Sequence, residues 1–274
     1  MKWIEAAVIS TLAQAVLGCL PPDFEIYLPQ KTDHYRLPGN HIPTANLAEV
    51  TVASTGGVTV AGFLARQNTP SVTPSVLFLH GVGGNLDNVW DWPMRLWDRG
   101  YNVLIIDYRG FGRSTGSPSE QGLYDDAASA LSFLMATPSI DNTRIVLWGF
   151  SLGSAVASEL ATIRPPTVLV LESPFTSMVD MVELSSPYSI PAAWVTDARF
   201  DTYARIGDIS APVVVAHGTD DHRVPYWMGE KVFGAAHDPK IFVCAQGAGH
   251  ETVFKTAAAQ IFAAISQMAD AAVP

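Results

Sequence analysis

The chain has 274 residues, of which 48% are hydrophobic and 15% charged, a balance typical of a globular protein with a substantial core. Its formal net charge of -10 argues against a nucleic-acid partner, which would select a basic face. The two cysteines, Cys19 and Cys244, lie far apart and form no C-x-x-C or paired Cys/His spacing, so neither zinc nor redox chemistry is indicated.

The N-terminal 45 residues are expected to form a helix and an extended connector. Residues 6–20 are uncharged and end like a lipoprotein cleavage box at Cys19, but Glu5 interrupts the start, and about 15 residues are too few to span a bilayer. Apolar residues recur every fourth position, at Ile4, Val8, Leu12 and Val16. We therefore expect a docked helix or a membrane-facing arm in preference to a signal peptide. A cytoplasmic location is favoured, with membrane association or export as open alternatives.

The following region, residues 46–274, predicts an α/β domain. A hairpin is expected first, because Leu47–Ala53 and Val58–Leu64 alternate around Gly56-Gly57. Short apolar runs typical of strands buried on both faces follow at 76–79, 103–106, 145–148, 168–171, 213–216 and 241–245. Helical patterns lie between them at 89–99, 122–137, 152–163, 226–236 and 252–268. This alternation specifies a mainly parallel sheet covered by helices on both faces.

One interval breaks the alternation. Residues 173–210 separate two strands by more than one helix and its loops need, so a small lid insert is predicted there. Its apolar residues either line an acyl or alcohol pocket or pack the insert onto the sheet; they are Met178, Met181, Val182, Leu184, Tyr188, Ile190, Trp194 and Phe200.

Ser151 is the expected nucleophile. It lies in Gly149-Phe150-Ser151-Leu152-Gly153, between an apolar run and an alanine-rich helical pattern. A strand that turns sharply into a helix exposes the hydroxyl at the turn, and flanking glycines relieve crowding there. A turn residue or a helix cap is the alternative role for Ser151.

Asp221 and His250 are the expected acid and base. Each follows a predicted strand, and loops after parallel strands emerge at the same sheet edge as the nucleophile. The order Ser151, Asp221, His250 permits His250 to act as general base and Asp221 to orient it. Asp220 and Glu172 are the competing acids.

A zinc site at His217, Asp221 and His222 is disfavoured, because these residues lie too close together in one loop. His217 is instead expected to satisfy backbone groups.

The oxyanion donors are expected to be the backbone N–H groups of Leu152, directly after the nucleophile, and Val82, with Gly83 as second choice. Val82 lies in the loop His80-Gly81-Val82-Gly83-Gly84-Asn85. A phosphate-binding role for this loop is disfavoured, because it lacks the P-loop lysine and the G-x-G-x-x-G spacing.

These segments resemble the α/β-hydrolase superfamily, and most closely its lipases that act on monoacylglycerols and lysophospholipids and their bacterial esterase relatives. The resemblance covers residue 75 to the C-terminus and rests on His80-Gly81, 107–114, 116–120, 149–153, 171–177, the Asp221 loop and His250. It implies that 107–114 is a structural loop beside the site. Several relatives have Asn where this chain has Val82, so only a backbone donor is inferred there.

The chain is therefore expected to be a serine esterase or lipase that acts on a small-molecule ester through an acyl-enzyme, with no cofactor and no metal. Peptidase or amidase activity on the same triad is the first alternative, and a non-catalytic ligand receptor the second. Peripheral membrane contact through the N-terminal helix is a further expectation. The sequence leaves the oligomeric state open.

Overall fold

A computed structural model of the chain describes residues 24–185 and 196–271. One eight-stranded sheet forms its centre, in the order β1-β2-β4-β3-β5-β6-β7-β8. The antiparallel hairpin β1–β2 occupies one edge, β2 pairs antiparallel with β4, and all later pairs are parallel. The strands are β1 (Leu47–Ala53), β2 (Thr59–Ala65), β3 (Ser75–Leu79), β4 (Asn102–Ile106), β5 (Ile145–Phe150), β6 (Val168–Glu172), β7 (Val213–Gly218) and β8 (Lys240–Ala245).

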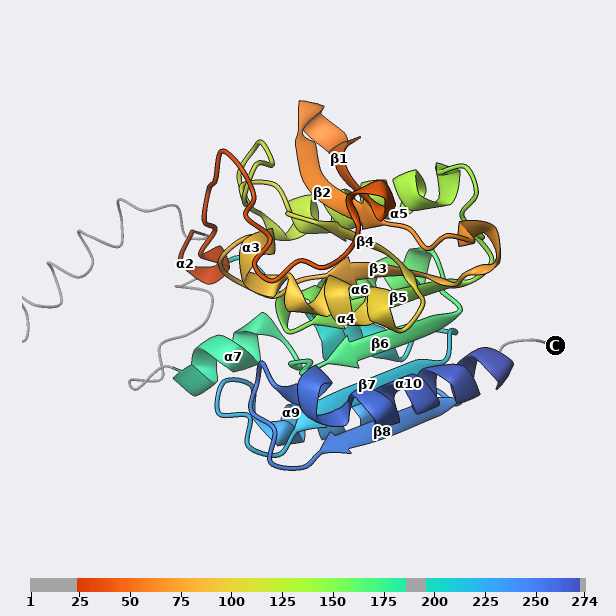
Figure 1. Cartoon of the computed structure of the whole chain (residues 1–274). Coiled ribbons are helices and arrows are strands. Elements are labelled where there is room, and N and C mark those ends of the chain that lie inside the picture. The colour runs from red at the N-terminus through yellow and green to blue at the C-terminus, as the bar shows by residue number, and fades with distance from the viewer. Residues whose placement is uncertain (1–23, 186–195, 272–274) are drawn as a thin grey trace, which may run out of the picture.

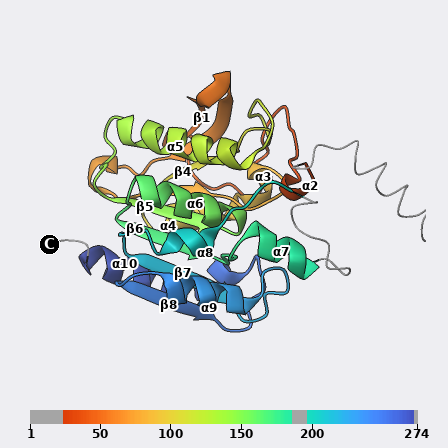
Figure 2. The same ribbon diagram turned by 180° about the vertical axis from the view of Figure 1, so that it is seen from behind.

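Helices cover both faces of the sheet. In Figure 1, α3 (Leu86–Val89), α4 (Asp91–Asp98) and α10 (Val253–Ala271) lie in front of it. The opposite view in Figure 2 has α5 (Glu120–Ala136), α6 (Leu152–Ile163), α8 (Thr202–Ile206) and α9 (Tyr226–Ala235) in front. Two separate apolar clusters fill the space between these layers and the sheet. The arrangement confirms the predicted α/β-hydrolase fold.

The expected strands are all present. The two edge strands β1 and β8 are only partly buried, whereas the strands between them lie between the two helix layers. β5 and β6 are buried at every position, as expected of central parallel strands. The helix expected over 89–99 differs from the prediction, since it begins earlier and is broken. Asn85 caps α3 by accepting from the Asp87 amide at 2.9 Å, and Trp90 separates α3 from α4.

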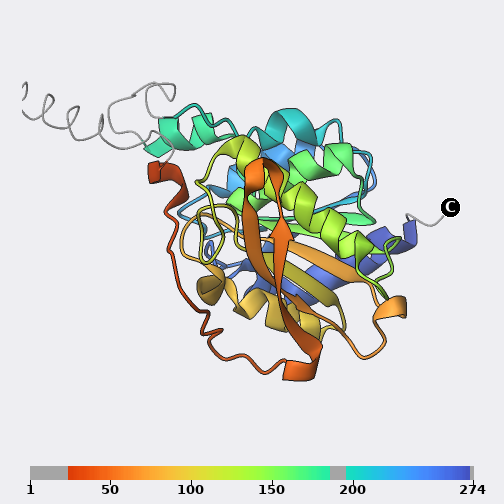
Figure 3. The ribbon, with the colours of Figure 1, turned by 90° about the horizontal axis from the view of Figure 1, so that it is seen from above.

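The chain ahead of β1 runs along the domain surface. α2 (Phe24–Tyr27) and α7 (Met178–Ser185) lie at the edge of the molecule where the parallel strands end (Figures 1 and 3). Three 3-10 helices complete the described elements, at Thr44–Asn46, Thr55–Gly57 and Pro70–Val72.

Two predictions fall wholly or partly outside the described residues: the helix over 6–20 and the middle of the 173–210 insert. Within the described part of the insert, Phe200 is fully buried between the rings of Tyr27 and Tyr124, with centroids at 6.0 and 5.7 Å. Phe200 therefore packs its part of the insert onto the domain. In the ranges that the structure describes, no helix combines the length and hydrophobicity needed to cross a bilayer.

Candidate active site

Ser151 occupies the sharp turn between β5 and α6. Its backbone φ of 53° lies in the left-handed region, where residues other than glycine are uncommon and strained. A side chain at Gly153 would overlap the carbonyl oxygen of Leu79, and one at Gly149 would overlap the carbonyl of Gly153. Both glycines are therefore required by the close approach of α6 to the sheet.

The structure brings Ser151, His250 and Asp221 into one hydrogen-bonded chain. His250 Nε2 lies 3.0 Å from Ser151 Oγ, and His250 Nδ1 lies 2.7 Å from Asp221 Oδ2. All three residues are buried, with exposed fractions of 5–8%. With the ring proton on Nδ1, Nε2 is free to accept the serine proton.

The second carboxylate oxygen of Asp221 is held by its own loop. Oδ1 accepts the backbone N–H groups of Arg223 at 2.9 Å and Val224 at 2.8 Å. Burial alone would raise the pKa of Asp221, but hydrogen bonds from His217 and His250 and from the Val224 amide hold that pKa well below its ordinary value. Asp221 is thus an ionised partner for His250.

The competing acids lie elsewhere. Asp220 is exposed, and its carboxylate accepts from Thr219 Oγ1 at 3.3 Å. Glu172 is fully buried behind the site and bonds two tryptophan indoles, Trp92 at 3.0 Å and Trp148 at 2.9 Å. Neither contacts the imidazole of His250 in the way that Asp221 does.

His217 supports the acid loop, as expected of a residue that satisfies backbone groups. Its Nε2 lies 2.9 Å from the Val224 carbonyl oxygen and 3.3 Å from Asp221 Oδ2. This second contact to the carboxylate was not predicted. His217 and Asp221 are four residues apart, so their closeness in one loop was evident from the sequence, but the contact of this ring with the carboxylate was not.

The loop after β3 lies beside Ser151. A Cβ atom at Gly81 would lie 3.2 Å from Ser151 Cβ, and Val82 lines the same cleft. The amide of Gly83 donates to the Tyr27 carbonyl at 2.9 Å, and that of Gly84 to the Leu28 carbonyl at 3.1 Å. Gly83 is therefore committed to another bond, which leaves Val82 as the better oxyanion candidate in this loop.

Leu152 begins α6 directly after Ser151, at the helix N-terminus, where backbone N–H groups lack intrahelical acceptors. Its position matches the other expected donor.

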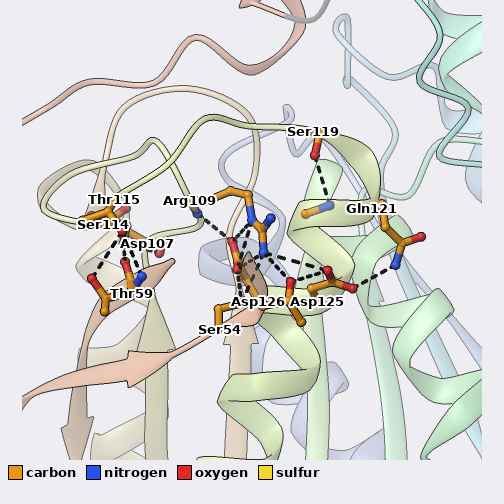
Figure 4. Close-up of polar contacts among 12 residues, drawn as sticks. Ser54, Thr59, Asp107, Arg109, Ser114, Thr115, Ser119, Gln121, Asp125 and Asp126 are labelled. Atoms are coloured by element: carbon orange, nitrogen blue, oxygen red, sulfur yellow. Dashed lines mark hydrogen bonds and ion pairs between the residues drawn. The ribbon is translucent and has the colours of Figure 1, made fainter. Parts of the chain in front are cut away.

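Figure 4 shows the polar contacts that fasten the loop over 107–119. Arg109 donates from Nη2 to Asp126 Oδ1 at 2.8 Å, and its backbone N–H donates to Asp126 Oδ2 at 2.7 Å. Ser114 Oγ donates to the Asp107 carbonyl at 2.6 Å and accepts the Ala61 amide at 2.8 Å. These bonds hold the loop to β2 and α5, in keeping with a structural role.

Asp107 and His80 form a buried polar pair under that loop. Burial raises the pKa of Asp107 to about 7, opposed by the hydrogen bond from the Tyr35 hydroxyl. Burial also lowers the pKa of His80 to about 4. His80 is therefore neutral at pH 7 and lies below the glycine loop, where it bonds the Gly81 carbonyl through Nδ1 at 2.8 Å.

A cleft of about 290 Å³ opens onto Ser151 and His250. One wall is formed by the glycine loop with Gln30, and another by Trp92 and Phe150. Arg223 and Glu251 form an ion pair at the rim, with Nη1 and Oε1 3.1 Å apart and side chains 59% and 62% exposed. The cleft is therefore small, and it is lined by both polar and apolar residues. The opposite charges of Arg223 and Glu251 offset each other at its rim.

Sequence and structure comparisons agree with this architecture. The model of a protein family described as "alpha/beta hydrolase fold" matches residues 74–194. An uncharacterized protein of Mycobacterium tuberculosis is 36% identical over 202 residues, which are 74% of this chain and 72% of that protein. The lysophosphatidylserine lipase ABHD12 of Danio rerio is 33% identical over 197 residues, 64% of this chain and 50% of that protein.

Among solved structures, the Pyrococcus furiosus esterase Pf2001 superposes with a TM-score of 0.66 at 18% identity, over 89% of this chain and 97% of that one. At this identity the likeness shows the fold alone. The match to the family model and the relative that is 36% identical show that the chain belongs to the α/β-hydrolase family.

Proposed function

We propose that the protein is a serine hydrolase that cleaves carboxylic esters through an acyl-enzyme intermediate. The observation that carries the proposal is the unbroken chain from Ser151 Oγ through the His250 imidazole to the Asp221 carboxylate, with links of 3.0 and 2.7 Å. A serine hydroxyl needs a base within hydrogen-bond reach and a third group that orients the base. This chain supplies both.

The proposed steps follow from the positions of these groups. His250 Nε2 takes the Ser151 proton as Oγ attacks the ester carbonyl, and the imidazolium then protonates the departing alcohol. Asp221 stabilises the imidazolium between these steps. The amides of Val82 and Leu152 are the proposed donors to the oxyanion. A water deprotonated by His250 then attacks the acyl-enzyme and releases the acid.

Short to medium acyl esters are the proposed substrates. The cleft of about 290 Å³ lies at the lower end of the range of small-molecule pockets, which is about 300–1,000 Å³. Relatives and structural neighbours are named as a lysophosphatidylserine lipase and esterases, which supports ester chemistry. The lipase name makes lysophospholipid esters one longer-chain alternative. Monoacylglycerol esters are another, and this one rests on the family resemblance of the sequence.

The peptidase alternative has less support. An aminopeptidase needs an acidic group that is free to bind the substrate amine. Among the described residues that line the cleft, the acidic residue is Glu251, and its carboxylate already forms an ion pair with Arg223. The test below measures amide hydrolysis directly, with anilides that match the esters.

The test is labelling of the purified protein with a fluorophosphonate probe, alongside hydrolysis of p-nitrophenyl esters from acetate to palmitate and of the matching anilides. Ser151→Ala should lose both labelling and hydrolysis. Ser158→Ala is the matched control, because Ser158 is a buried serine of the adjacent helix whose hydroxyl bonds only the Ser154 carbonyl, at 2.8 Å. A folded wild type that neither labels nor hydrolyses esters would overturn the proposal and favour a receptor.

A further inference from the structure

Glu172, the last residue of β6, has a fully buried carboxylate outside the Ser151–His250–Asp221 chain. Its Oε2 accepts the indole N–H groups of Trp148 at 2.9 Å and Trp92 at 3.0 Å. Its Oε1 accepts the backbone N–H of Phe254 at 3.0 Å. All three partners are donors, so the ionised carboxylate matches its surroundings.

These donors belong to three segments that build the site. Trp148 lies on β5, three residues before the nucleophile. Trp92 is part of the cleft wall and packs on Phe150, with ring centroids 5.0 Å apart, and Phe150 in turn contacts the His250 ring at 5.1 Å. Phe254 lies in the first turn of α10, four residues after the proposed base. One carboxylate therefore joins the nucleophile strand, the cleft wall and the base loop.

The backbone around Glu172 reaches the same two catalytic groups. The Ser151 amide donates to the Glu172 carbonyl at 2.9 Å, and Ser173 Oγ donates to the His250 carbonyl at 3.4 Å. Ser173 has a φ of 49°, a strained value for a residue other than glycine. Strain of this kind persists only where the surrounding contacts fix the chain, and here those contacts include the triad itself.

We propose that Glu172 is a positioning residue that, as an ionised carboxylate, fixes the His250 loop against the Ser151 strand and the Trp92 wall. The inference rests on the proposed function, because it concerns the geometry of the same triad. Glu172 itself touches no reacting atom.

The charge of Glu172 has a chemical consequence. A neutral carboxyl group or a glutamine amide at this position carries a hydrogen-bond donor of its own. That donor would face one of the three N–H groups that now donate to the carboxylate, so at least one of the three bonds would be lost. The groups that face it are Trp92 from α4, Trp148 from β5 and the Phe254 amide from α10, and its neighbours across the sheet are Phe150 and Ala216. None of these is ionisable. Burial accordingly raises the pKa of Glu172 to about 7, and the three donors oppose that rise.

The test compares the pH dependence of kcat for p-nitrophenyl acetate in wild type and Glu172→Gln. Deprotonation of Glu172 should add about one to the limiting slope of the wild-type acid limb on a logarithmic plot, and the variant should lack this contribution. We expect kcat of the variant to fall on the order of 10²-fold, with KM changed far less, because small displacements of catalytic groups have effects of this size.

Two further variants separate positioning from general stability. Asp126→Asn alters another fully buried carboxylate, one that pairs with Arg109 away from the triad, and should keep the wild-type slope. Trp148→Phe removes one donor to Glu172 and should move the second acid-limb pKa to higher pH while the carboxylate remains. This variant answers the question even where Glu172→Gln is poorly folded.

The proposal is overturned where folded Glu172→Gln keeps the wild-type kcat and slope, or where Trp148→Phe leaves the acid limb unmoved. Either result counts against the role of Glu172 when the wild type labels with fluorophosphonate and hydrolyses esters, because the proposed function then stands. An inactive wild type is a different outcome, which overturns the proposed function and this role with it.

Discussion

Replacement of Asp221 by asparagine should lower kcat by forcing the wrong tautomer on His250. The loop amides of Arg223 and Val224 both donate to Oδ1, so the oxygen of the asparagine must occupy that place. Its NH₂ group then faces His250 Nδ1, which is 2.7 Å from the present Oδ2. Nδ1 becomes the acceptor, the ring proton moves to Nε2, and Nε2 can no longer take the proton of Ser151.

The expected loss is large. The same change of tautomer in serine proteases lowers kcat about 10⁴-fold, which corresponds to about 5 kcal/mol of activation free energy. The NH₂ group also faces His217 Nε2, now 3.3 Å from the carboxylate, which donates to the Val224 carbonyl at 2.9 Å. This second clash between donors makes the asparagine a poor fit and leaves no arrangement that rescues the active tautomer.

The assay is kcat for p-nitrophenyl acetate, with the rate of fluorophosphonate labelling as a second readout. Asp220→Asn is the matched control, because its carboxylate is exposed and lies one residue away in the same loop. We expect the control to stay within a factor of about two of wild type, as surface substitutions usually do. An Asp221→Asn enzyme within tenfold of wild type would refute the assignment of Asp221.

Three further predictions concern stability and substrate choice. Because burial raises the folded-state pKa of Glu172 from 4.5 to about 7, protonation of this carboxyl group stabilises the folded chain. This stabilisation is complete below about pH 4.5 and is lost as pH rises through 7. Between pH 5 and 8 the wild-type unfolding free energy should therefore fall by on the order of 2 kcal/mol more than that of Glu172→Gln, and parallel denaturation curves would contradict this. Gly153→Ala should abolish activity and lower the melting temperature, because the added Cβ would overlap the Leu79 backbone. Gly234→Ala is the control and should leave activity intact, because its added Cβ meets no atom within 4 Å. Equal melting temperatures of Gly153→Ala and wild type would show that α6 can move to make room. Gln30→Ala should change KM along the ester series while kcat for acetate is retained, because Gln30 lines the cleft without contacting the triad, and an unchanged KM profile would exclude a role for this wall.

Much of the fold could be predicted because its signals are local. The buried strands appear as continuous apolar runs, and the helices between them carry their own periodicity. The meeting of Ser151, Asp221 and His250 was predictable for a related reason. Each follows a parallel strand, and all such strand ends share one edge of the sheet.

The support of the site could not be predicted from local pattern. Glu172 is 80 residues from Trp92 and 82 from Phe254, so nothing in the neighbouring sequence indicates that their donors converge on its carboxylate. The sequence alone could suggest only that an acidic residue at a strand end belongs to the catalytic edge. Glu172 is for that reason a competing triad acid on sequence grounds, and its bonds to the two indoles explain why its carboxylate does not bind His250.

The N-terminal connector shows how a segment outside the family match still shapes the site. The Gln30 amide donates to the Gly84 carbonyl at 2.9 Å, and the Gln30 carbonyl accepts the Gly112 amide at 2.9 Å. The connector thereby joins the glycine loop to the loop after β4, and it takes up the amides of Gly83 and Gly84. Because these two amides already have acceptors, Val82 is the donor that we propose for the oxyanion in the glycine loop. The proposed catalytic geometry thus depends on chain that precedes the first strand of the sheet.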